Sequence, residues 1–99
     1  MNRLDYLREA GELITGDRER DYGPPSENFR NIAQGVSIIL GATVSAFRVA
    51  LFMAWVKLAR LSSRTISREA IRDSILDAIA YLALAGELFE KSEESNEHR

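Results

Sequence analysis

Apolar residues recur every three or four positions along most of this chain, which is the spacing of amphipathic helices. The first such pattern predicts a helix over residues 2–15. Its apolar stripe consists of Leu4, Leu7, Gly11 and Ile14. The second pattern predicts a helix over residues 26–40, which Ser26 can cap and Gly41 can end, because glycine accepts the left-handed backbone that follows many helices. The polar segment between them contains a double proline and cannot continue either helix.

A third helix is predicted after Thr43 or Ser45, either of which can cap its first turn. The residues of its apolar stripe are Phe47, Ala50, Leu51, Ala54, Leu58 and Leu61. The middle of this helix, VALFMAWV over residues 49–56, is apolar on every side. A helix without a polar face is buried all round, so we expect it at the centre of its bundle or in the interface of a homo-oligomer.

The fourth helix is the longest, and Thr65 or Ser67 is expected to cap it. It is predicted to end near Phe89, with residues 91–99 as a polar, frayed tail. The residues predicted to face inward are Ile71, Ile75, Ile79, Leu82, Gly86 and Phe89. Because no segment alternates apolar and polar residues as a strand does, residues 1–90 are predicted to form one all-α domain, a small four-helix bundle with a long C-terminal helix that assembles into oligomers.

Composition narrows the classes of protein to which this chain can belong. Its 99 residues, 45% hydrophobic and 28% charged, can bury only a modest core. The formal net charge of −2 provides no general attraction to nucleic acids or anionic membranes, and no apolar run is long enough for a membrane span. The chain has no cysteine, which excludes disulfides and thiolate chemistry and suits a reducing compartment, so we expect a cytoplasmic protein.

Acidic and basic residues are placed so that they can meet between the last two helices. Asp73, Asp77 and Tyr81 are spaced by four and share one side of the fourth helix. Two carboxylates one turn apart repel each other unless a cation compensates them. Lys57 and Arg60 come within reach of these carboxylates if the last two helices form an antiparallel hairpin. We interpret this cluster either as a structural ion-pair network or as part of a binding site.

The polar segment GDRERDYGPPSENF, residues 16–29, carries more specific chemistry than a connection between helices requires. It joins arginines, a Tyr-Gly pair and the free amides of a helix start, which together suit an anionic ligand with a flat ring. We therefore predict a nucleotide site between this segment and the charged cluster, with Tyr22 or Phe29 stacked on the base. The residues predicted to bind the ligand are Arg18, Asp21, Tyr22, Gly23, Asn28, Phe29, Lys57, Arg60 and Tyr81.

Four motifs follow one another along the chain: DR-x-x-DYG, ENF, K-L-A-R-L and R-D-S-x-x-D-x-x-x-Y. With this combination, over about residues 7–87, the chain resembles a family of short phage and prophage proteins of unassigned function. It is similar, more distantly, to the nucleotide-modification-associated helical domains, which carry a DYG segment and a Lys-x-x-Arg-Leu helix. Through them it resembles the MazG-like all-α nucleoside triphosphate pyrophosphohydrolases.

The resemblance to MazG-like enzymes implies a Mg²⁺ site. Those enzymes hold the metal with two glutamates on one helix and an acidic pair on a later one, and the metal activates water against a triphosphate. By this resemblance Asp73 and Asp77, with Glu12 or Glu27, would hold Mg²⁺. Glu9 and Glu12 have the E-x-x-E spacing of the first pair, whereas the later pair is D-x-x-x-D instead of E-x-x-D.

Three functions agree with these residues. The first is a Mg²⁺-dependent nucleotide pyrophosphohydrolase in which Arg18, Lys57 and Arg60 neutralise phosphates. The second is a non-catalytic protein that binds a nucleotide or cyclic nucleotide and sequesters a signal used in host defence, in the cytoplasm of a bacterial host. The third is a helical interaction module that forms a homo-oligomer through the apolar third helix. Metal dependence separates the first two, and loss of all nucleotide affinity would leave only the third.

Overall fold

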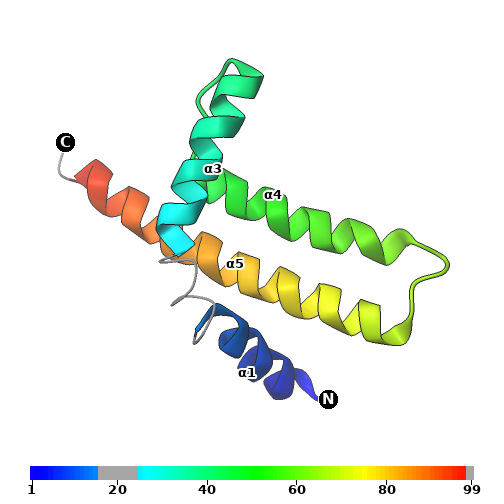
Figure 1. Cartoon of the computed structure of the whole chain (residues 1–99). Helices are drawn as coiled ribbons and strands as arrows, with labels where there is room; N and C mark the ends of the chain where they lie inside the picture. The colour runs from blue at the N-terminus through cyan, green and yellow to red at the C-terminus, as the bar shows by residue number, and fades with distance from the viewer. Residues whose placement is uncertain (16–24, 98–99) are drawn as a thin grey trace.

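The computed structural model describes residues 1–15 and 25–97, and all regular secondary structure in these ranges is helical (Figure 1). The elements are α1 (Arg3–Ile14), α3 (Pro25–Leu40), α4 (Ala46–Ala59), the 3-10 turn η1 (Arg60–Ser62) and α5 (Arg68–Glu97). The predicted all-α fold with a long C-terminal helix is therefore confirmed. Within the same ranges, no helix combines the length and the apolar character that crossing a lipid bilayer requires.

Local side-chain chemistry sets several helix ends, as predicted. Ser45 caps α4, because its Oγ accepts a hydrogen bond of 3.1 Å from the backbone N–H of Arg48. Ser67 does the same for α5, where its Oγ accepts a 3.1 Å hydrogen bond from the N–H of Ala70. Gly41 follows α3 with a φ of 69°, in the left-handed region that ends many helices. Each of these three ends was visible in the sequence.

Two helix boundaries differ from the prediction. α3 begins at Pro25, so Ser26 lies inside its first turn and does not cap it. Proline fits this position because the first N–H groups of a helix have no partner within it. α5 continues about two turns beyond the predicted end near Phe89, so most of the predicted tail is helical. Glu and Lys are good helix formers, and Glu87 pairs with Lys91 one turn later, with 3.3 Å between Oε1 and Nζ.

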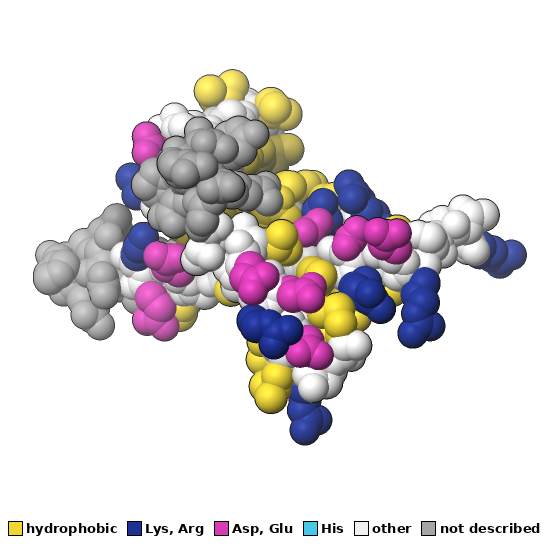
Figure 2. Space-filling model, turned by 60° about the horizontal axis from the view of Figure 1, so that its bottom comes forward, with side chains coloured by type: hydrophobic (Ala, Val, Ile, Leu, Met, Phe, Trp, Pro, Cys, Tyr) yellow, Lys and Arg dark blue, Asp and Glu magenta, His cyan; other side chains and the backbone are white. Residues whose placement is uncertain are grey.

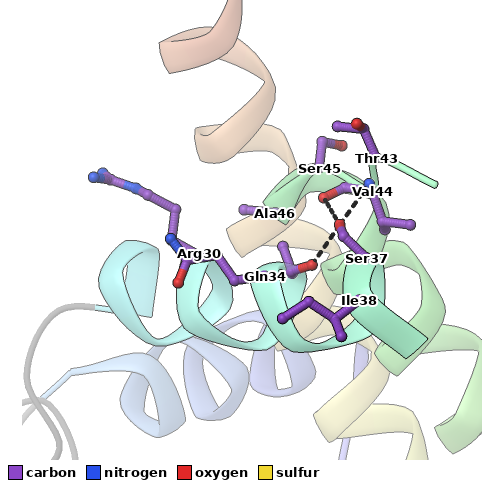
Figure 3. Close-up of a pocket in the computed structure, with 9 residues that line it drawn as sticks. Arg30, Gln34, Ser37, Ile38, Thr43, Val44, Ser45 and Ala46 are labelled. Atoms are coloured by element: carbon purple, nitrogen blue, oxygen red, sulfur yellow. Dashed lines mark hydrogen bonds between the residues drawn. The ribbon is translucent and has the colours of Figure 1, made fainter. Parts of the chain in front are cut away.

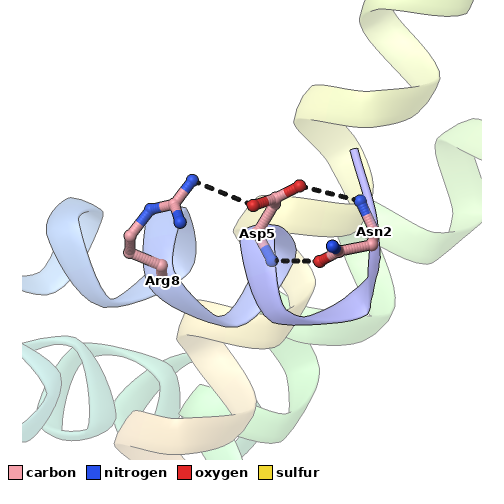
Figure 4. Close-up of polar contacts among 3 residues, drawn as sticks. All are labelled: Asn2, Asp5 and Arg8. Atoms are coloured by element: carbon pink, nitrogen blue, oxygen red, sulfur yellow. Dashed lines mark hydrogen bonds and ion pairs between the residues drawn. The ribbon is translucent and has the colours of Figure 1, made fainter.

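α1 begins with two reciprocal hydrogen bonds (Figure 4). The N–H of Asp5 donates to Oδ1 of Asn2, and the N–H of Asn2 donates to Oδ2 of Asp5, both at 2.9 Å. Nη2 of Arg8 lies 3.1 Å from the other oxygen of Asp5. The hydrogen bond from the Asn2 backbone, assisted by Arg8, lowers the pKa of Asp5 below its ordinary value of 3.8. This capping box holds the amino end of α1 in place.

α4 and α5 lie side by side in an antiparallel hairpin that forms most of the structure (Figure 1). α1 packs along α5, and α3 crosses the hairpin at the beginning of α4. α3 touches α5 only near its own start, where it meets the middle of the long helix. This hairpin is the arrangement in which Lys57 and Arg60 were expected to come within reach of the carboxylates of α5.

The core lies where α3, α4 and α5 meet, and small side chains make up much of it. Its buried residues are Phe29, Ala33, Val49, Ala50, Ala85 and Leu88. Alanines let helix backbones approach closely, but each contributes little apolar area to the core. Many of the larger apolar side chains lie on the surface of this chain instead.

Parts of three predicted apolar stripes are not covered, and in the α4 stripe Leu51 and Leu58 are exposed. Leu4 and Leu7 of α1 are exposed, and α1 buries Ala10 against α5 in their place. On α5, Ile71, Leu82 and Phe89 are exposed although they were predicted to face inward. That prediction is wrong within a single chain, because α5 has apolar residues on more than one side and buries others. Its buried residues are Ser74, Leu76, Ala78, Ala80, Ala85 and Leu88.

Candidate functional site

The predicted charge contact between the last two helices is present at the α4–α5 interface. Nζ of Lys57 lies 3.1 Å from Oδ2 of Asp77. The Lys57 side chain is 16% exposed and the Asp77 side chain is 33% exposed, so the pair is largely withdrawn from water. Lys57 occupies the last turn of α4, and the antiparallel turn back into α5 brings the carboxylate beside it.

The other two members of the charged cluster lie at the surface. Arg60 belongs to η1, which packs against α5, and its side chain is exposed. Asp73, one turn before Asp77, is exposed as well. Within residues 1–15 and 25–97, neither Arg60 nor Asp73 forms an ion pair with the other members of the cluster. The predicted four-residue network therefore consists of one formed pair and two side chains that a ligand can reach.

Tyr81 continues the same side of α5 and connects the cluster to α3. Its ring meets the ring of Phe29 edge-on, with 6.0 Å between centroids and 73° between planes. Phe29 is only 4% exposed and belongs to the core. Phe29 thus fills the junction of α3 with the hairpin, and its stacking on a base stays a prediction from the sequence. Tyr81 itself is half-buried.

The other predicted wall of the site lies mainly outside the described residues. Asn28 is exposed in the first turns of α3, beside the point where Phe29 anchors that helix to α5. The predicted ligand residues outside the described ranges are Arg18, Asp21, Tyr22 and Gly23. Their roles stay predictions from the sequence.

The carboxylates expected to hold Mg²⁺ do not come together in the described part of the chain. No group of three or more acidic or histidine side chains there is arranged to hold a metal ion. Acidic side chains are instead spread along the molecule (Figure 2). Glu12 and Glu27 are exposed on α1 and α3, and neither forms such a group with the acidic pair of α5. A divalent cation needs several oxygen ligands that converge, so these residues do not fit the implied metal within one chain.

A shallow groove that the sequence did not predict opens between the end of α3 and the start of α4 (Figure 3). Its volume is about 540 Å³. The polar residues that line it are Arg30, Gln34, Ser37, Thr43 and Ser45. None of the predicted ligand residues lines this groove. The signal in the sequence was the pair of hydroxyl residues after Gly41, which we interpreted only as helix caps.

Ser37 shapes this groove by fastening the turn between α3 and α4 (Figure 3). Its Oγ accepts a 2.8 Å hydrogen bond from the N–H of Val44 and donates a 2.7 Å hydrogen bond to the carbonyl of Ala33. One hydroxyl thus satisfies a backbone donor of the turn and a backbone acceptor of the helix. This role is structural and leaves the hydroxyl no spare proton for a ligand.

Comparison with known proteins assigns the chain to a family. The family model for a domain of unknown function, DUF6378, matches residues 5–89. The chain belongs to the DUF6378 family. The Gene 55 protein of Mycobacterium phage D29 is 35% identical over 85 residues, which cover 86% of this chain and 54% of that protein. The DUF6378 chain therefore spans about half the length of this curated relative. No solved structure matches the chain.

The DUF6378 match and the phage relative agree with the predicted resemblance to a phage protein family of unassigned function. The matched range includes most of α1, all of α3 and α4, and the part of α5 that carries Asp73, Asp77 and Tyr81. Both walls of the predicted nucleotide site thus lie inside the DUF6378 domain. The similarity to nucleotide-modification-associated domains and to MazG-like enzymes stays a prediction.

Proposed function

We propose that this DUF6378 protein binds a nucleotide, with the α4–α5 cluster as the phosphate end of the site. The observation that carries the proposal is the Lys57–Asp77 pair, 3.1 Å long and largely withdrawn from water, with Tyr81 one turn further along α5. A cation, a carboxylate and a phenol on neighbouring turns can form hydrogen bonds with the polar groups of a nucleotide. Phosphate oxygens accept from cations, and ribose or base N–H and O–H groups donate to carboxylates.

The cation of this site is positioned before a ligand arrives. The Lys57 side chain lies at the α4–α5 interface with 16% of its surface exposed, and Asp77 holds its ammonium group. Lysine has three donor hydrogens, so the ammonium can keep its contact with Asp77 while it donates to a phosphate oxygen. Arg60 is exposed one turn later and would add a planar guanidinium, which binds phosphate through two parallel hydrogen bonds.

In this proposal the second wall is the segment that precedes α3. Since Phe29 is buried, stacking on the base falls to Tyr22, and Arg18 contributes a further cation for phosphate. Support for this part comes from the anchoring of α3, because the Phe29–Tyr81 contact holds the start of that helix beside the charged cluster.

The proposal concerns binding, and hydrolysis is not part of it. A Mg²⁺-dependent pyrophosphohydrolase needs several carboxylates around its metal, and the described residues do not offer such a group. Binding by cations and an aromatic ring requires no metal. Among the functions that the sequence suggests, a protein that sequesters a nucleotide or cyclic nucleotide therefore agrees better with the geometry.

The direct test is calorimetric titration with a panel of nucleoside triphosphates and cyclic dinucleotides, with and without Mg²⁺, followed by chromatography of each mixture. We expect binding that does not depend on Mg²⁺ and a ligand that is recovered intact. Metal-dependent release of pyrophosphate would replace the proposal by the enzymatic function. If no member of the panel binds, the nucleotide role is refuted for this chain, and the helical interaction module is the remaining hypothesis.

Two matched variants locate the site. Lys57→Met should weaken nucleotide binding at least about tenfold, because a charge-assisted hydrogen bond contributes about 1.5–3 kcal/mol. Lys91→Met is the control, since Lys91 also forms an ion pair, 3.3 Å from Glu87, but on an exposed part of α5. Equal affinities for Lys57→Met and Lys91→Met would show that any nucleotide binds elsewhere.

A further inference from the structure

The outward face of α4 exposes several large apolar side chains to solvent. The buried residues of this helix are Val49, Ala50 and Ala54. On its other side, Leu51, Phe52, Trp55 and Leu58 are exposed. These four residues lie within about 120° of one another around the helix axis, since each residue turns the helix by about 100°. The segment over residues 49–56, which is apolar on every side, is thus covered by the rest of this chain on one side only.

We propose that a second copy of this chain covers the outward face of α4, so that the two α4 helices pack against each other at the centre of a homodimer. Phe52 is 66% exposed and Trp55 is 69% exposed, and large aromatic residues of this kind dominate the energetics of protein interfaces. Of the buried hydrophobic residues in the described chain, by contrast, most are alanines. The dimer would bury the large residues that the single chain does not.

The exposed area agrees with a stable dimer. If a large apolar residue presents about 200 Å² when fully exposed, the exposed fractions of the four α4 residues correspond to about 400 Å². The tip of α3 adds about as much again through Ile38, Ile39 and Leu40, and hydrophobic side chains are visible there in Figure 2. Added together, these areas approach the roughly 800 Å² that each partner contributes to a standard interface, and the α4 face alone is as large as the largest apolar patch of a typical monomer.

Charge favours a second copy over a charged partner. Arg48 and Lys57 are the charged residues of α4, and Lys57 is held on the inward side by Asp77. The outward face therefore carries Arg48 alone, at its amino-terminal end. In a two-fold dimer the same patch meets itself, and here apolar side chains would meet apolar side chains without a central like-charge pair. A strongly basic partner would find no complementary charge among the residues of this face, and a strongly acidic one would find Arg48 alone, at the end of the helix.

The dimer can be tested in the unmodified protein, because Trp55 is the sole tryptophan of the chain. We expect light scattering to give twice the chain mass at high concentration, with Trp55 emission at short wavelength and protected from iodide. On dilution, the mass and the iodide protection should fall together. The proposal would be overturned if light scattering gave the mass of one chain even at high concentration and iodide quenched the emission of Trp55.

Cysteine cross-linking locates the interface, since the natural chain has no cysteine. Phe52→Cys and Leu4→Cys are a matched pair, because Phe52 is 66% exposed on α4 and Leu4 is 67% exposed on α1. A short bismaleimide should link two copies of Phe52→Cys rapidly and two copies of Leu4→Cys only at the rate of random collisions. Equal rates, or faster linking of Leu4→Cys, would overturn the proposed interface.

A charged substitution completes the test and separates this inference from the proposed function. Phe52→Glu should weaken the dimer at least about 100-fold, as expected for an interface hot spot, and keep its helical circular dichroism because the new carboxylate is solvated in the monomer. Phe52 and Lys57 point to opposite sides of α4, so nucleotide affinity should not change. An undiminished dimer of Phe52→Glu would refute the interface whether or not a nucleotide binds.

Discussion

The pair of Lys57 and Asp77 can be tested as a structural element by a double-mutant cycle. Lys57→Met keeps the length and the buried apolar stem of the side chain and removes only the ammonium group. Asp77→Asn keeps the shape of the other partner and removes its charge. If the ion pair forms as the structure has it, the cost of the double variant is smaller than the sum of the two single costs.

The size of the expected coupling follows from the geometry. At 3.1 Å and an effective dielectric constant of about 20, the attraction between two unit charges is about 5 kcal/mol. Most of this gain is offset by the lost hydration of both groups and by about 2 kcal/mol of side-chain entropy for an immobilised lysine. We therefore expect Lys57→Met to lower the free energy of unfolding by about 2 kcal/mol, with a coupling of about 1–2 kcal/mol between the two sites.

The measurement is urea unfolding followed by circular dichroism, at one fixed protein concentration because a dimer would make stability concentration-dependent. Lys91→Met is again the control, since its exposed pair with Glu87 should contribute less than about 0.5 kcal/mol. Additive effects of Lys57→Met and Asp77→Asn, within about 0.3 kcal/mol, would refute the reasoning. Such a result would mean that the two charges do not meet in solution.

Three further predictions concern the turn between α3 and α4 and the start of α1. Ser37→Ala should cost about 1–2 kcal/mol of stability, because the N–H of Val44 loses its 2.8 Å partner, and hydrogen exchange of that amide should accelerate. Gly41→Ala should cost about 1 kcal/mol in urea unfolding from backbone strain alone, since its φ is 69° and no atom lies within 4 Å of an added Cβ. Because the folded pKa of Asp5 lies below 3.8, its stabilisation should be fully present above that pH and be lost as the pH falls through the folded value. The stability difference between the wild type and Asp5→Ala, measured by urea unfolding from pH 6 downward, should therefore shrink at acidic pH.

Several features of the candidate site were predictable because they depend on the spacing of residues along one helix and on the short connection between α4 and α5. Asp77 and Tyr81 are one turn apart in any helix, and the short connection between α4 and α5 leaves an antiparallel hairpin as the simple arrangement. The ion pair with Lys57 followed from these two facts. The role of Phe29 did not, because an aromatic residue beside a polar segment suits a binding site and a core equally well. Which of the two it serves depends on the helix that packs against it.

The amino-acid sequence by itself determined the all-α fold and several helix ends, including the caps at Ser45 and Ser67 and the left-handed Gly41. Those features arise from hydrogen bonds and backbone preferences between residues a few positions apart. Only the tertiary structure decided which apolar faces are covered within one chain. Periodicity identifies an apolar stripe but not the surface that packs against it. In this chain, alanines make up much of the buried core. Large residues such as Trp55 were thereby left at the surface.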